Sequence, residues 1–71
     1  MKSEIIKTID KFECAAGKVF LDKMKNSLYN YYVTWEYLCE PMEHQGFNTL
    51  QMAQMLFLDK SAILMNRSEV I

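Results

Sequence analysis

The scarcity of turn-forming residues is the feature of this chain that most constrains its fold. The 71 residues include two glycines and one proline, whereas a sheet with several tight turns ordinarily draws on more residues of these types. Apolar residues make up 51% of the sequence, which is generous for a chain that supports one small core. We therefore expect a single all-α domain over residues 1–71, with enough apolar surface left over to favour self-association.

The first 30 residues carry apolar side chains at helical spacing. A heptad-like seam of this kind is typical of helices that pack along their length. It predicts a long helix over residues 3–30 and a dimer interface on that helix. The interface residues are Ile5, Ile9, Phe12, Ala16 and Val19.

A second helix is expected over residues 34–45. Trp35, Leu38 and Met42 follow the spacing of a buried helical face, and Thr34 before them is a suitable N-cap. Pro41 conflicts with a continuous helix interior because it lacks the backbone N–H group. We therefore expect this second helix to kink or to restart near the proline.

Residues 48–71 are interpreted as two short helices joined by a tight turn. Asn48 and Gln51 fit a capping box, which predicts a third helix over 49–56. A turn over 57–59 follows, and Asp59 caps the fourth helix. The small side chain of Ala53 suits the close crossing of a helix-turn-helix, the unit that presents a helix to the major groove of DNA.

The order of these elements resembles the MarR/SarA-type winged-helix transcriptional regulators. The similarity is carried by VTWEYL at 33–38 and NTLQMAQMLFLDKSAI at 48–63. It implies about four helices with a helix-turn-helix at 48–71, a dimerising first helix, and a role as a DNA-binding regulator of transcription. The family's wing and C-terminal dimerisation helices have no counterpart after Ile71, so the resemblance is to its N-terminal part.

The DNA-contacting residues follow from this resemblance. A serine hydroxyl can bond a phosphate or a base edge, and an alanine methyl can contact thymine. The net charge of −1 predicts weak or partner-dependent DNA binding. The alternative is a helical protein-interaction module that binds no DNA, such as an anti-repressor or a heterodimer partner. The residues expected at DNA are Thr49, Lys60, Ser61, Ala62 and Met65.

The remaining reactive or distinctive side chains support no catalytic function. Cys14 is a candidate redox sensor because hydroperoxide-sensing members of the family carry a cysteine in the first helix, and a buried structural cysteine is the alternative. Cys39 and His44 do not share a helical face, so no metal site is expected. The chain has no nucleophile with a positioned base, so neither an enzyme nor a cofactor is expected. A methionine-rich stripe in the last quarter is interpreted as adaptable core or as a partner surface.

The expected partners are a second copy of the chain, in a homodimer or higher oligomer, double-stranded DNA, or another regulator. No apolar run approaches the roughly 20 residues of a membrane span, and the sequence MKSEIIKTIDKFE lacks the apolar stretch of a signal peptide. We therefore expect a cytoplasmic protein with no membrane contact.

Overall fold

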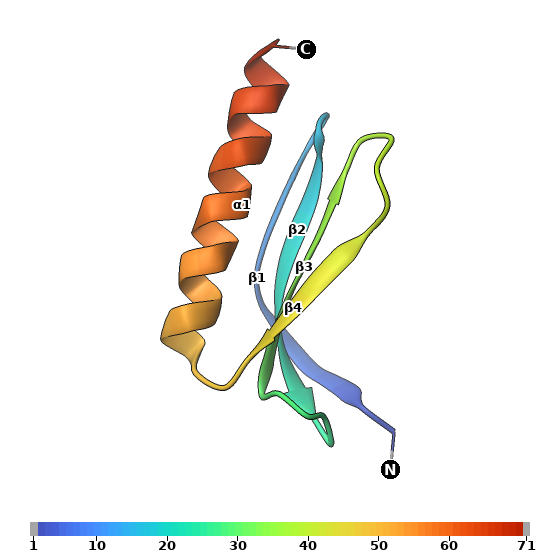
Figure 1. The fold of residues 1–71 in the computed structure, drawn as a ribbon, viewed down its shortest axis with the longest axis vertical. Coiled ribbons are helices and arrows are strands. Elements are labelled where there is room, and N and C mark those ends of the chain that lie inside the picture. The colour runs from blue at the N-terminus through green and yellow to red at the C-terminus, as the bar shows by residue number, and fades with distance from the viewer. Residues whose placement is uncertain (1, 71) are drawn as a thin grey trace.

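Four antiparallel strands and one helix make up residues 2–70, the part of the chain that the computed structural model describes (Figure 1). The strands lie in the sheet in chain order, so each pairs with its sequence neighbour. Residues 1 and 71 lie outside the described part. Residue 1 begins the expected domain, and residue 71 ends both that domain and the expected helix-turn-helix. The elements are β1 (Glu4–Cys14), β2 (Gly17–Lys25), β3 (Tyr31–Tyr37), β4 (Glu43–Phe47) and α1 (Leu50–Val70).

The prediction of an all-α fold is wrong, because residues 3–30 and 34–45 form strands and turns in place of helices. The composition of β3 gives the physical reason. Its aromatic and β-branched side chains fit a pleated surface better than a helix. Tyr31, Val33, Trp35 and Tyr37 alternate along the strand and all belong to the core or pack against it, as strand geometry requires.

The turns use residues other than glycine, which explains why the low glycine count was misleading. Asn26, between β2 and β3, has a φ of 57°, and Cys39, between β3 and β4, has a φ of 65°. Both occupy the left-handed region that glycine ordinarily fills. Gly17, with a φ of 150°, starts β2, where an added Cβ would collide with the carbonyl oxygen of Glu36 in β3.

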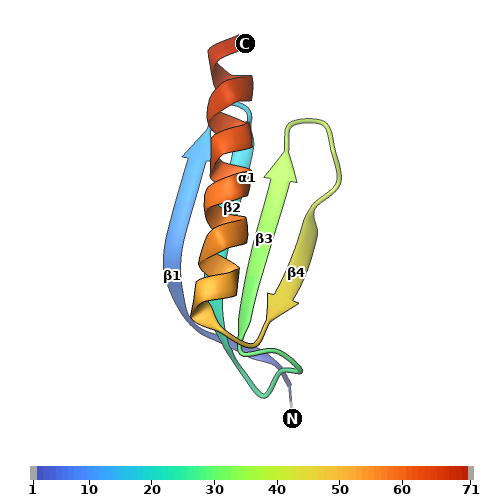
Figure 2. The ribbon, with the colours of Figure 1, turned by 60° about the vertical axis from the view of Figure 1, so that its left-hand side comes forward.

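Helix α1 covers one face of the sheet, mainly over the two central strands β2 and β3 (Figure 2). The contact between them is the hydrophobic core, which draws on both central strands, the first turn and the helix. Because both layers contribute apolar side chains, the sheet and the helix depend on each other for burial. The buried apolar residues are Ala16, Val19, Leu21, Val33, Trp35, Ala53, Phe57 and Leu64.

Helix α1 is continuous, so the turn expected over 57–59 is absent and the predicted helix-turn-helix and winged-helix class are wrong. Phe57, placed in that turn by the prediction, is 5% exposed and lies in the core. It falls one helical turn after Ala53 and two turns before Leu64, so all three meet the sheet on one helical face. Burial of this face favours an uninterrupted helix.

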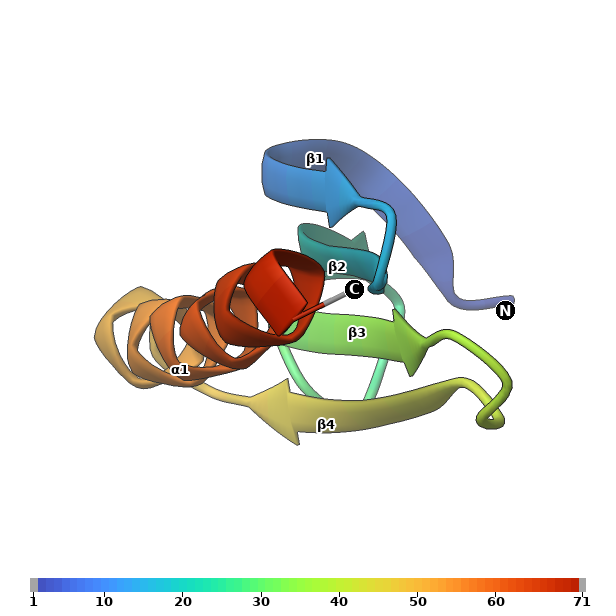
Figure 3. The same ribbon diagram turned by 90° about the horizontal axis from the view of Figure 1, so that it is seen from above.

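Strand β1 is irregular and bends away from α1 at its N-terminal end (Figure 3). The pairing register with β2 shifts between Ile5 and Lys7 and again between Thr8 and Asp10. Each shift is a bulge that leaves one residue unpaired and increases the local twist. The second bulge lets Ile9 pack against the core.

Candidate interaction surfaces

The side of α1 that faces away from the sheet carries large apolar side chains. Met52 is 53% exposed, Met55 61%, Leu58 66% and Met65 51%. Met55, Leu58, Ala62 and Met65, which we call the outer stripe, recur at gaps of three, four and three. At 3.6 residues per turn these four lie within an arc of about 80°. Helix α1 therefore has a second apolar face that its own sheet leaves uncovered.

The local sequence explains why α1 forms at this position. Thr49 caps the helix, since its Oγ1 accepts a hydrogen bond from the backbone N–H of Met52 at 3.4 Å. The segment that follows is rich in leucine, methionine, alanine and glutamine, all of which favour helices. Arg67 lies in the last turn, where its positive charge is favourable to the helix dipole. The cap differs from the prediction by one residue, because Thr49 takes the role assigned to Asn48.

The cationic side chains of α1 are engaged by its own sheet. The Lys60 ammonium lies 4.4 Å from the ring centroid of Trp35, and the Arg67 guanidinium lies 4.2 Å from that of Tyr37. Arg67 also donates a hydrogen bond to Glu40 at 2.7 Å. Cations over aromatic faces are attracted by the ring quadrupole. These contacts hold both positive charges on the sheet side of the helix.

The face of the sheet opposite α1 has no covering element within residues 2–70 (Figure 3). A hollow of about 280 Å³ lies on it. This volume is below the roughly 300–1,000 Å³ of most small-molecule sites. The hollow is lined by Ser3, Ile5, Asp22, Met24, Ser27, Tyr32, Thr34 and His44.

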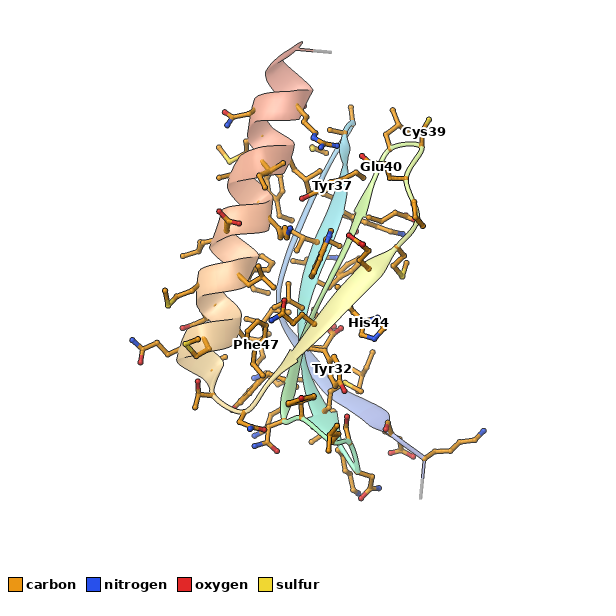
Figure 4. All side chains as sticks on the ribbon, in the orientation of Figure 1. Tyr32, Tyr37, Cys39, Glu40, His44 and Phe47 are labelled. Atoms are coloured by element: carbon orange, nitrogen blue, oxygen red, sulfur yellow. The ribbon has the colours of Figure 1, made fainter. Side chains whose placement is uncertain are left out.

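The polar and aromatic groups of this hollow contact one another. Asp22 is 7% exposed, and its Oδ1 accepts a hydrogen bond from the Thr8 hydroxyl at 2.7 Å. The Tyr32 ring lies 6.0 Å from the Tyr29 ring and 5.7 Å from the His44 ring, on the side of β3 and β4 away from α1 (Figure 4). We interpret the hollow as packing of the uncovered face, because its central groups already have partners.

The charges on the uncovered face do not favour an anionic ligand. Alternation along β1, β2 and β3 places two lysines and three carboxylates there. Lys18 and Glu36 form an ion pair at 3.7 Å. The face therefore carries a slight excess of negative charge, which would repel a phosphate backbone. The charged residues are Lys11, Glu13, Lys18, Asp22 and Glu36.

Both cysteines line a second hollow, of about 450 Å³, where the β1–β2 and β3–β4 turns meet. Cys14 is half-buried, and its thiol donates a hydrogen bond to the Leu64 carbonyl at 3.7 Å. Cys39 is exposed in the β3–β4 turn beside Glu40 (Figure 4). Among the described residues no group of three or more histidine, cysteine or acidic side chains is placed to hold a metal ion. The redox role of Cys14 stays a prediction.

The residues predicted to contact DNA do not share one face. Thr49 caps α1, Lys60 lies over Trp35, and Ser61 is 8% exposed against the sheet. Ala62 is exposed and Met65 is half-exposed, and both belong to the outer stripe. The set therefore divides between the sheet side and the outer side of the helix. The reason is the single continuous helix, which rotates successive residues by about 100°.

The residues of the predicted helical dimer interface do not form a seam. Ala16 and Val19 are buried in the core of the chain itself, and Ile9 and Phe12 pack against that core. Ile5 is 58% exposed and lines the hollow on the other face. These residues lie on strands and in a turn, where helical spacing does not bring side chains together.

The comparisons with known proteins give no family assignment. The chain matches no family profile, and a search of curated proteins and of solved structures finds no match to it. Among the described residues, no helix has both the length and the apolar character that crossing a bilayer requires.

The outer stripe is present in the sequence as a pattern, but the expected turn over 57–59 divides it between two short helices and places Leu58 outside both. With α1 continuous, Met55, Leu58 and Met65 fall on one side. The signal that identifies this surface is a second apolar repeat, offset from the one that faces the sheet.

Proposed function

We propose that this protein is a protein-interaction module whose docking surface is the outer stripe of α1. The observation that carries the proposal is the exposure of 51% to 66% at Met55, Leu58 and Met65. Full burial of a methionine or leucine side chain contributes about 1.5–3 kcal/mol. A helix that is apolar on two sides normally has neighbours on both, and the sheet supplies one of them.

The charge distribution favours a protein partner over nucleic acid. The net charge of the chain is −1, and Lys60 and Arg67 are engaged by Trp35 and Tyr37. DNA binding depends largely on lysine and arginine side chains that are free to neutralise phosphates. The helix-turn-helix mode of groove reading also requires the two-helix unit that the continuous helix α1 replaces. Methionine side chains adapt to irregular partner surfaces, which supports protein recognition by the outer stripe.

Site-specific photo-crosslinking in cells tests this proposal. A photoreactive phenylalanine analogue placed at Leu58 should form a covalent adduct with a protein partner, because the 66% exposed side chain lies at the centre of the surface. The same analogue at Gln45, an exposed residue of β4, is the matched control and should give no adduct. Absence of a protein adduct at position 58, or equal adducts at both positions, contradicts the proposal.

A further inference from the structure

One oxygen of the buried Asp22 carboxylate has no partner in the packing of the hollow on the uncovered face. The residue is 7% exposed, and its Oδ1 accepts a hydrogen bond from the Thr8 hydroxyl at 2.7 Å. Within residues 2–70, Oδ2 accepts no hydrogen bond and Asp22 takes part in no ion pair. A carboxylate can accept about four hydrogen bonds, and a buried charge is normally paired. Oδ2 is therefore a charged acceptor that is available to a ligand.

The bend of β1 builds one wall of this hollow. The two bulges turn the N-terminal end of the strand away from α1 (Figure 3), and Ser3 and Ile5 at this end line the hollow. Ser3 is held in place because its hydroxyl donates a hydrogen bond to the Asn26 carbonyl at 3.1 Å. The volume of about 280 Å³ is too small for a drug-sized ligand. It suits a charged group comparable in size to a water molecule, about 30 Å³, with a few methylenes attached.

The lining of the hollow offers what an alkylammonium group requires. An ammonium group carries a positive charge and three N–H donors, and it has no acceptor. Asp22 supplies the charged acceptor, and the hydroxyl oxygens of Ser27 and Thr34 supply neutral ones. The ring of Tyr32 lines the same hollow (Figure 4), and aromatic faces attract cations. The apolar side chain of Met24 provides a contact for the methylenes.

Other charged ligands match this site less well. An anion would be repelled by the Asp22 carboxylate, on a face that already carries a slight excess of negative charge. A hard metal cation requires about six oxygen ligands, and the described residues offer no group of three acidic, histidine or cysteine side chains. A guanidinium group binds a carboxylate best through both oxygens, but Thr8 occupies one of them. A single ammonium group matches the one free oxygen.

We infer that the hollow on the uncovered face binds a primary alkylammonium group, with Asp22 as its charged acceptor. Free alkylamines and the lysine side chains of other polypeptides both carry this group. The site lies on the face of the sheet opposite α1, so it is separate from the outer stripe and goes beyond the proposed docking function. One charge-assisted contact and a small apolar area predict an affinity in the millimolar range.

Titration of the isotope-labelled protein with n-butylammonium chloride, followed by two-dimensional NMR at constant ionic strength, tests the site. The amide signals of Asp22, Tyr32 and Thr34 should shift saturably, with a dissociation constant of about 1–10 mM. n-Butanol has the same chain without the charge and should produce no saturable shift of these signals. n-Butylguanidinium should bind at least about threefold more weakly, because its planar fork finds one free oxygen.

Two carboxylate-to-amide variants locate the charge that binds the ligand. Asp22→Asn keeps the size of the side chain and an acceptor for the Thr8 hydroxyl, and it should weaken butylammonium binding at least about tenfold. Glu36→Gln makes the same change on the same face but outside this hollow, and binding should stay within about twofold of the wild type. Tyr32→Leu removes the ring and should weaken binding about threefold. The dispersion of the NMR spectrum verifies that each variant is folded.

A lysine analogue distinguishes the two sources of the ammonium group. Nα-acetyl-lysine N-methylamide presents the lysine side chain as a polypeptide does. An affinity equal to or higher than that of n-butylammonium assigns the site to a lysine of another polypeptide. An affinity at least about tenfold lower assigns it to a free amine.

The outcomes decide this inference independently of the proposed function. Saturable binding that is lost in Asp22→Asn and kept in Glu36→Gln establishes the ammonium site. Equal shifts with n-butanol or with sodium chloride alone, equal binding of n-butylguanidinium, or unchanged binding by Asp22→Asn overturns it. The crosslinking experiment at Leu58 concerns the other face of the molecule, so a failure there leaves the result at Asp22 standing, and the reverse also holds.

Discussion

The two sides of α1 have similar apolar character and different surroundings. On the sheet side, Phe57 is 5% exposed and Leu64 is fully buried against β2 and β3. On the outer side, Leu58 and Met65 directly follow these residues in the sequence and are 66% and 51% exposed. Neighbouring residues thus have different roles. Those on the sheet side stabilise the fold of one chain, and those on the outer side are available to a second chain. Hydrophobicity alone does not separate these two roles, whereas position around the helix does.

The two sides of α1 should differ most in the free energy of unfolding that is lost when a side chain is truncated, and the adjacent residues Leu64 and Met65 allow the comparison. Leu64→Ala should lower the free energy of unfolding by about 3 kcal/mol, because it leaves a cavity in the core. Met65→Ala should change it by no more than about 0.5 kcal/mol. A domain of this size has a total stability of about 4–10 kcal/mol, so the first loss is severe. Urea denaturation followed by Trp35 fluorescence at low protein concentration measures both, and equal losses would contradict the division.

A pair of glycine substitutions extends the comparison to the sheet, where the loss of stability should be larger on the face covered by α1 than on the uncovered face. Gly17→Ala should cost about 2 kcal/mol, because the new Cβ meets the Glu36 carbonyl oxygen and lies 3.0 Å from Leu64 Cδ2. At Gly46 the new Cβ meets Cδ2, Cγ and Cβ of Tyr29, so this tyrosine and its turn must shift together, but no backbone atom of a paired strand is in the way. Gly46→Ala should therefore cost less than Gly17→Ala, about 1–1.5 kcal/mol. Thermal denaturation of both variants gives the ranking, and a reversed order would refute it.

The smallest expected change in the free energy of unfolding comes from Lys60, which lies over Trp35 at the edge of the α1 face that packs on the sheet. Lys60→Met keeps most of the apolar stem and removes the positive charge. The loss of the cation–π contact at 4.4 Å should lower the free energy of unfolding by about 0.5–1 kcal/mol. The exposed Lys23 of β2 provides the control, because Lys23→Met should leave stability nearly unchanged. If both variants behave alike in urea denaturation, the Lys60–Trp35 contact contributes nothing measurable.

The helical character of residues 50–70 could be predicted from the sequence, but its continuity could not. The cap at Thr49 and the apolar repeat from Ala53 onward are local signals, and a helix follows from them. Asp59 was interpreted as a second cap because aspartate often begins helices. In the structure it lies within α1 and is exposed. The choice between cap and helix interior depended on the sheet that buries Phe57 and Leu64, and a local pattern does not contain that information.

Bulges in β1 disguise the alternation of this strand, so its sequence predicts a helix. A regular strand directs every second residue to the same face, but the shift between Thr8 and Asp10 resets that order. Ile9 and Phe12, three residues apart, both reach the core as a result. Their separation imitates a helical repeat. In β3 the alternation is regular, but the same residues also fit a helix that begins with a cap at Thr34, and the local sequence does not decide between the two.

The candidate site was only partly predictable. The sequence indicated surplus apolar surface and a methionine-rich stripe in the last quarter, and exposed methionines lie on the outer side of α1; that they contact a partner stays a prediction. Which residues form that surface depends on the rotation of α1 against the sheet. That rotation is fixed by long-range packing of Ala53, Phe57 and Leu64 on β2 and β3, so the set containing Leu58 emerges only with the tertiary structure.

The position of α1 after the sheet in the chain has a consequence for synthesis. A ribosome adds about 5–20 residues per second, so the 21 residues of α1 take roughly 1–4 s to appear after β4. Hairpins form within microseconds, so the sheet can pair long before the helix exists. During that interval Val33 and Trp35, buried in the finished protein, face solvent or a chaperone. The nascent sheet is therefore most vulnerable to aggregation in the seconds before α1 emerges.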